Sequence, residues 1–80
     1  MKIDDLEKRL IEENCPRVYS LKGGLPNEEY CIGFNNGSWE VYYSERGIKS
    51  GLKIFDNEED ACEYFYNNIF AYRPPQKPDI

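Results

Sequence analysis

The side chains of this 80-residue chain that could do chemistry are carboxylates and thiols, because the sequence contains no histidine. Histidine is the usual general base near neutral pH, so Ser/His/Asp and Cys/His arrangements are excluded. The densest acidic run, Asp56 to Glu63, opens a helical pattern, where capping and the helix dipole account for it. The sequence therefore predicts no catalytic residue and no enzymatic activity. A carboxylate-dependent hydrolase is the least favoured alternative.

The three cysteines, Cys15, Cys31 and Cys62, predict neither disulfides nor a metal site. Their odd number and the lack of a CxxC pair favour free thiols in a reducing compartment. A zinc site would need all three thiolates and a carboxylate, because no histidine is available. The pair Gly23-Gly24 is too short for a phosphate-binding loop, and no Lys-Ser/Thr pair follows it. We therefore expect no metal and no cofactor.

The charge balance favours a basic protein as partner. The chain has 15 acidic and 10 basic residues and a net charge of −5. It contains no basic cluster, so nucleic acid is not expected to bind. An acidic surface attracts a basic partner. No apolar run approaches the length of a membrane span, and Met1 to Asp5 do not begin a signal peptide, so we expect a cytoplasmic protein without membrane contact.

The first third of the chain reads as a helix, a short strand and a loop. Apolar residues recur at helical spacing over Asp4 to about Asn14, and Asp4 with Glu7 is a plausible capping-box variant. Pro16 disfavours helical geometry at the preceding residue and ends the helix. A short first strand is expected over Val18–Leu21, and the glycine-rich segment that follows it reads as a loop. The apolar stripe of the helix comprises Ile3, Leu6, Leu10 and Ile11.

The middle of the chain reads as a β-hairpin. Residues Tyr30–Phe34 alternate in the pattern of a strand, and Asn35-Asn36-Gly37 tolerates the positive φ angles of a tight turn. The strand Ser38–Glu45 then folds back onto the first strand. After a turn at Arg46-Gly47 we expect a loose segment, Ile48 to Gly51, and a last strand over Leu52–Phe55.

A second helix is expected from Asp56 onward, with Asp56 as N-cap and Glu59 at the third position. Pro74-Pro75 ends it. Its buried stripe is expected to contain Ala61, Phe65 and Ile69, widened by Cys62, Tyr64 and Phe70.

These elements predict an α+β fold in which an antiparallel sheet of three to four strands carries both helices on one face. Residues 1–73 form the single domain, and residues 74–80 form an extended Pro-rich tail. Trp39, Val41 and Tyr43 are expected on the helix-covered face of the sheet, because side chains alternate along a strand. The facing row of Tyr30, Ile32 and Phe34 is expected to form one continuous apolar surface with them. Glu40 and its alternate neighbours then point to the opposite face, which is left open.

Two surfaces are candidates for partner binding. The open sheet face presents an aromatic ring between a carboxylate and a hydroxyl, a combination typical of interfaces, although Tyr42 could also simply shield the sheet. The rival surface is the acidic start of the second helix. The candidate partner-binding residues are Glu40, Tyr42, Ser44 and Glu45 on the sheet, and Glu58, Glu59, Asp60 and Glu63 on the helix.

The chain contains a series of short motifs between residues 18 and 70, namely Gly24-Leu25-Pro26-Asn27-Glu28-Glu29-Tyr30-Cys31, Trp39-Glu40-Val41-Tyr42-Tyr43-Ser44-Glu45-Arg46-Gly47, Phe55-Asp56, Glu58-Glu59 and Ala61-Cys62-Glu63-Tyr64. Together these motifs resemble those of small immunity proteins from bacterial polymorphic-toxin and contact-dependent growth inhibition systems. The resemblance covers roughly residues 18 to 70. The resemblance implies a cytoplasmic non-enzyme that binds and blocks one cognate toxin domain, often a nuclease. It transfers a role and no site residues, because partner contacts differ between members.

A second hypothesis fits the same residues. An acidic regulatory or structural module could self-associate through its open sheet face and form a weak homodimer. The two hypotheses differ in the partner, which is a toxin domain with a basic surface in the first and a second copy of the chain in the other.

Overall fold

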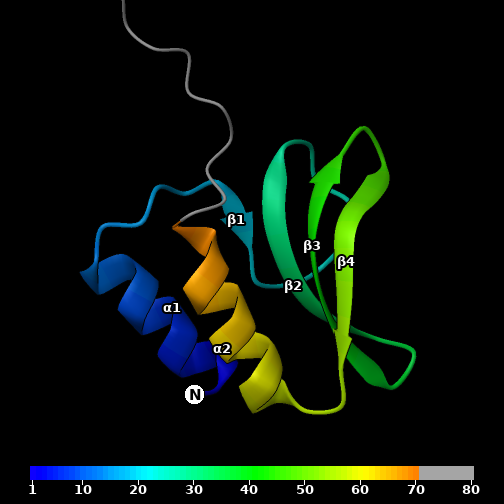
Figure 1. Cartoon of the computed structure of the whole chain (residues 1–80). Coiled ribbons are helices and arrows are strands. Elements are labelled where there is room, and N and C mark those ends of the chain that lie inside the picture. Colours follow the sequence, from blue (N-terminus) through cyan, green and yellow to red (C-terminus); the bar gives the residue numbers. More distant parts are fainter. Residues whose placement is uncertain (71–80) are drawn as a thin grey trace, which may run out of the picture.

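The computed structural model describes residues 1–70 and has the expected α+β class (Figure 1). Two helices lie side by side on one face of a four-stranded sheet with strand order β1-β2-β3-β4. The predicted tail, residues 74–80, lies outside the described residues. The elements are α1 (Ile3–Glu12), β1 (Tyr19–Ser20), β2 (Glu29–Asn35), β3 (Ser38–Glu45), β4 (Ile48–Phe55) and α2 (Glu58–Ile69).

The expectation of an all-antiparallel sheet is wrong, because β1 pairs with β2 in parallel. The chain leaves β1 in a loop that returns to the start of β2, so no tight hairpin joins the two strands. The Gly23 N–H donates to the Ile32 carbonyl oxygen at 2.9 Å, and the Tyr30 N–H donates to that of Val18 at 3.0 Å. The expected first strand, Val18–Leu21, is thus present as the shorter β1, and the loop that follows β1 crosses the sheet.

Two hairpins join the remaining strands. Asn36 and Gly37 have φ angles of 53° and 80°, and Arg46 and Gly47 have 54° and 77°. Positive φ at both central residues is the pattern of type I′ turns, which match the twist of paired strands. The second turn places Ile48 directly opposite Glu45, so β4 begins there and the expected loose segment is wrong.

The two helices begin at the same end of the molecule (Figure 1). The Glu58 carboxylate accepts a hydrogen bond of 2.9 Å from the Ile3 N–H and so joins the first turns of both helices.

The first turns of both helices differ from the predicted caps. The N-cap of α2 is Asn57, whose side-chain oxygen accepts from the Asp60 N–H at 2.8 Å, so the prediction of Asp56 was wrong by one residue. The predicted Asp4–Glu7 box is also wrong, because Asp5 accepts from the Lys2 N–H.

The hydrophobic core lies between the helices and the sheet. Phe65 of α2 is fully buried, and its ring centroid is 4.9 Å from that of Tyr30 on β2. Val41 confirms the predicted face assignment, because it is buried on the helix-covered side. The buried cluster comprises Leu6, Leu10, Cys15, Tyr30, Ile32, Val41, Tyr43, Ala61, Cys62, Phe65 and Ile69.

We predict that Phe65→Ala lowers the free energy of unfolding by about 3–5 kcal/mol, because it removes a ring from the centre of this core. The exposed Asn67→Ala, on the same helix, should change it by less than about 0.5 kcal/mol. Chemical denaturation followed by circular dichroism measures both values. Equal stability of the two variants would contradict the assignment of Phe65 to the core.

Candidate functional site

The sheet face opposite the helices is covered, which corrects the expectation that it is open. The loop after β1 crosses this face, and the Tyr42 hydroxyl donates a hydrogen bond of 2.6 Å to the Gly24 carbonyl oxygen. Tyr42 is 2 % exposed, Glu40 is 9 % exposed and Ser44 is fully buried. These three predicted partner-binding residues are therefore inaccessible to a partner in this conformation.

Two glycines explain how the loop can lie so close to the sheet. A Cβ atom added to Gly33 on β2 would lie 2.6 Å from the Gly23 Cα, which is shorter than any tolerated contact. A side chain at Gly33 would thus push the loop away from Tyr42. Glycine inside a strand often marks such a close backbone approach, so the sequence carried the signal.

Glu40 and Tyr42 also have partners within the chain. The Lys49 ammonium lies 2.7 Å from the Glu40 Oε1 atom and 4.7 Å from the centroid of the Tyr42 ring. Burial raises the pKa of the Tyr42 hydroxyl to about 12. The open-face hypothesis fails because it considered the alternation of the strand without the loop that crosses it.

The acidic start of α2 is accessible in part. Glu59, Asp60 and Glu63 are exposed. Glu58 is engaged within the chain, because its carboxylate accepts from the Ile3 N–H and lies 3.9 Å from the Lys2 ammonium. Glu45 is exposed beside the β3–β4 turn, at the opposite end of the sheet. The structure therefore brings the four predicted residues of α2 together and separates them from Glu45.

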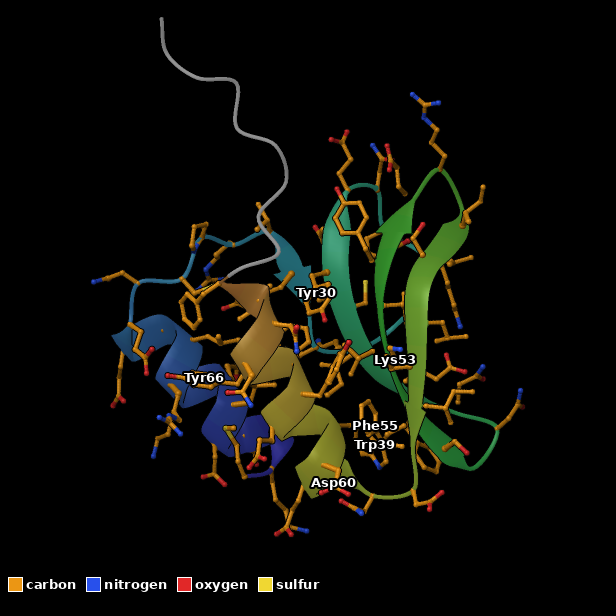
Figure 2. The ribbon with its side chains drawn as sticks, in the orientation of Figure 1. Tyr30, Trp39, Lys53, Phe55, Asp60 and Tyr66 are labelled. Carbon is orange, nitrogen blue, oxygen red and sulfur yellow. The ribbon has the colours of Figure 1, made fainter. Side chains whose placement is uncertain are left out.

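Partly exposed aromatic residues lie beside two of these carboxylates, Asp60 and Glu63. Phe34 is 62 % exposed, and its ring packs edge-on against Trp39 with centroids 5.4 Å apart. Trp39 stands opposite Phe55 in the sheet, and the Phe55 ring is 5.3 Å from that of Tyr64 on α2. Figure 2 shows Trp39 and Phe55 at the end of the sheet where α2 begins, near Asp60.

We call this surface the aromatic–acidic corner. It consists of Phe34, Trp39, Phe55, Tyr64, Glu59, Asp60 and Glu63.

A hollow of about 280 Å³ opens within the corner, lined by Phe55, Asp60, Glu63, Tyr64 and Asn67. Two carboxylates next to two aromatic rings suit a cationic side chain, because ring faces and carboxylates both attract positive charge. Asp60 is held in place by the Asn57 amide, whose nitrogen donates to it at 3.1 Å. The hollow can therefore accept the end of a lysine or arginine side chain.

The aromatic part of the corner was missed by sequence reasoning. Phe34 continues the apolar alternation of its strand and was expected in the core with Tyr30 and Ile32. It lies at the hairpin end, however, and remains exposed despite its ring contact with Trp39. Its position directly before the Asn-Asn-Gly turn was the only signal in the sequence.

The thiols show no sign of reactivity. All three cysteines are buried thiols that form no disulfide, as the sequence predicted. Burial raises the pKa of both Cys31 and Cys62 to about 11, so these two thiols are protonated near neutral pH and are poor nucleophiles. Residues 1–70 contain no group of three or more potential metal ligands, and no helix in that range could span a membrane.

We predict that Tyr42→Phe lowers the free energy of unfolding by about 0.5–1.5 kcal/mol, because the hydrogen bond from the Tyr42 hydroxyl to the Gly24 carbonyl oxygen is lost. The pKa of the Tyr42 hydroxyl is raised from 10.0 to about 12 in the folded chain, so folding favours the protonated hydroxyl. The stability that the protonated hydroxyl contributes is therefore complete below pH 10 and is lost as the pH rises toward about 12. The stability difference between wild type and variant should therefore shrink over that interval in urea titrations. A constant difference would contradict the buried hydroxyl.

Comparison with known proteins gives no family for this chain. No protein-family model matches it, and no curated protein or solved structure matches it. The resemblance to immunity proteins therefore stays a prediction, and the geometry of the corner is what supports a function.

Proposed function

We propose that this chain is a cytoplasmic immunity protein that neutralises a cognate toxin domain by direct contact. The observation that carries the proposal is the aromatic–acidic corner, where exposed carboxylates of α2 lie beside partly exposed rings. Such a surface suits the basic substrate cleft of a nuclease, which must attract phosphates. The proposed action is steric, and no residue of this chain performs chemistry on the toxin.

Charge and aromatic area have different tasks in this proposal. The net charge of −5 and the α2 carboxylates speed the encounter with a basic domain, an effect that weakens as salt rises. Phe34 and Trp39 supply large, rigid apolar area, which is what the energetic anchors of interfaces share. Charge should thus govern mainly the association rate, and the rings should govern the dissociation rate.

Self-association through the sheet face is less favoured as a function. The loop after β1 and the Tyr42–Gly24 hydrogen bond cover that face. A dimer built there would first have to remove the loop.

We predict that expression of this chain protects bacteria from the toxin domain encoded by the adjacent upstream reading frame, and that the two proteins copurify. Growth of cells expressing the toxin, with and without this chain, measures the protection. Continued killing in the presence of well-folded chain would contradict the proposed function.

The charge contribution is tested with Glu59→Gln/Glu63→Gln. We predict slower association with the toxin domain and a weaker dependence of the rate on salt, because two attractive charges are lost. The matched control is Glu7→Gln/Glu12→Gln, which removes two exposed charges from α1. Surface plasmon resonance at low and high salt separates the two variants. Equal effects would show that only the net charge matters and that the corner is not the binding site.

The aromatic contribution is tested with Phe34→Ser. The exposed ring contacts Trp39 but adds little to the core, so we predict a near-normal melting temperature. We expect toxin affinity to fall by about 30-fold or more through faster dissociation, the size typical of an anchor residue. The exposed Ile11→Ser on α1 is the control. Unchanged dissociation for Phe34→Ser would remove this ring from the interface.

A further inference from the structure

The edge of the sheet at β4 is unusually open for pairing. This strand has eight residues and lies at the end of the strand order, whereas the other edge, β1, has two residues. No other described element lies beyond β4. A long unpaired edge presents backbone N–H and C=O groups to any strand that approaches.

The register of the sheet identifies which backbone groups point outward. The two-residue turn at Asn36-Gly37 makes Asn35–Ser38 a hydrogen-bonded pair, so the even-numbered residues of β3 bond toward β2. Lys49 and Ile54 stand opposite the even-numbered Ser44 and Glu40. Because hydrogen-bonding groups alternate in direction along an antiparallel ladder, the backbone N–H and C=O groups of Lys49 and Ile54 point away from β3.

The side chains of β4 are apolar on both faces of the sheet. Ile54 stands opposite Glu40 on the loop-covered face and is 62 % exposed, although it is a large apolar residue. Ile48 stands opposite Glu45 on the helix-covered face and is also exposed. Lys49 is neutralised by Glu40, so Lys53 is the only cation of the strand without an ion pair among the described residues. A neighbouring strand would find apolar contacts on both sides.

The edge is continuous with the aromatic–acidic corner. Phe55 ends β4 and also lines the hollow of about 280 Å³ together with Asp60 and Glu63. A strand added along β4 would therefore run directly into the corner. Its residue beside Phe55 could place a cationic side chain in the hollow.

We propose that β4 receives an extended strand of the basic toxin domain, which lengthens the sheet by one strand. This inference rests on the proposed function and names the way in which the partner docks. The strand of the partner is apolar beside Ile54, uncharged or acidic beside Lys53, and carries lysine or arginine at the Phe55 end. Backbone pairing supplies affinity, and this charge pattern supplies specificity.

Two other occupants fit the edge less well. A second copy would bring together two chains that each carry a net charge of −5, and like net charges disfavour this association. The segment 71–80 of this chain contains Pro74, Pro75 and Pro78, which have no N–H to donate to a strand. The charge pattern therefore favours a basic partner.

The test uses Ile54→Pro, with Ile54→Thr as the matched control. Proline removes the outward N–H and leaves the ladder to β3 intact, whereas threonine keeps the N–H and also shortens the exposed apolar side chain. The probe is the purified toxin domain encoded upstream. We expect the proline variant to bind it at least about tenfold more weakly than the threonine variant. Equal affinity of the two variants, both with wild-type circular dichroism, would overturn the proposal.

Amide hydrogen exchange of the wild-type chain gives a second readout that needs no substitution. The N–H groups of Lys49 and Ile54 should exchange fast in the free chain and slowly in the complex. Fast exchange in the complex would overturn strand addition even if the proline variant fails to fold. A free chain that sediments as a dimer, with these two amides already protected, would assign the edge to a second copy.

The outcomes separate this inference from the proposed function. If wild-type chain binds the toxin domain and Glu59→Gln/Glu63→Gln slows association while both amides stay unprotected, the function stands and strand addition fails. If wild-type chain does not bind the toxin domain at all, the proposed function and this inference fail together.

Discussion

The close approach of the β1–β2 loop to the sheet determines which surfaces of this protein are accessible. The loop can cross the sheet because Gly33 has no side chain where Gly23 passes, and the Tyr42 hydroxyl then satisfies the Gly24 carbonyl. The helices cover one face of the sheet and the loop covers the other. The parts of the sheet that a partner can still reach lie at the end where α2 begins and along β4.

Much of the fold was predictable because local chemistry and tertiary packing agree. The Asn36-Gly37 turn fixed the central hairpin, and helical spacing placed Phe65 in the core. The parallel β1, the start of β4 at Ile48 and the covering loop were missed, because each depends on contacts between distant residues. The Arg46-Gly47 turn was recognised, but the strand after it contains Ser50 and Gly51, which lower its β propensity.

The candidate site was predictable only for its charges. The carboxylates of α2 are exposed as expected, since they lie at the start of a helix whose apolar stripe faces the sheet. The burial of two aromatic rings was predicted wrongly. Tyr42 was expected outside and is buried by the loop, whereas Phe34 was expected inside and lies beyond the reach of the core. Alternation along a strand predicts the face of a side chain, but the depth of burial depends on what covers that face.

The most direct test of the central claim uses Trp39, the single tryptophan of the chain, which lies in the aromatic–acidic corner. Its indole N–H gives one resolved signal in a nitrogen–proton NMR spectrum. We predict that titration with the toxin domain shifts this signal together with the amides of Phe55 and Glu63, and leaves those at the end of α1 unchanged. A tight complex that leaves the indole signal in place would contradict the assignment of the corner as the binding site.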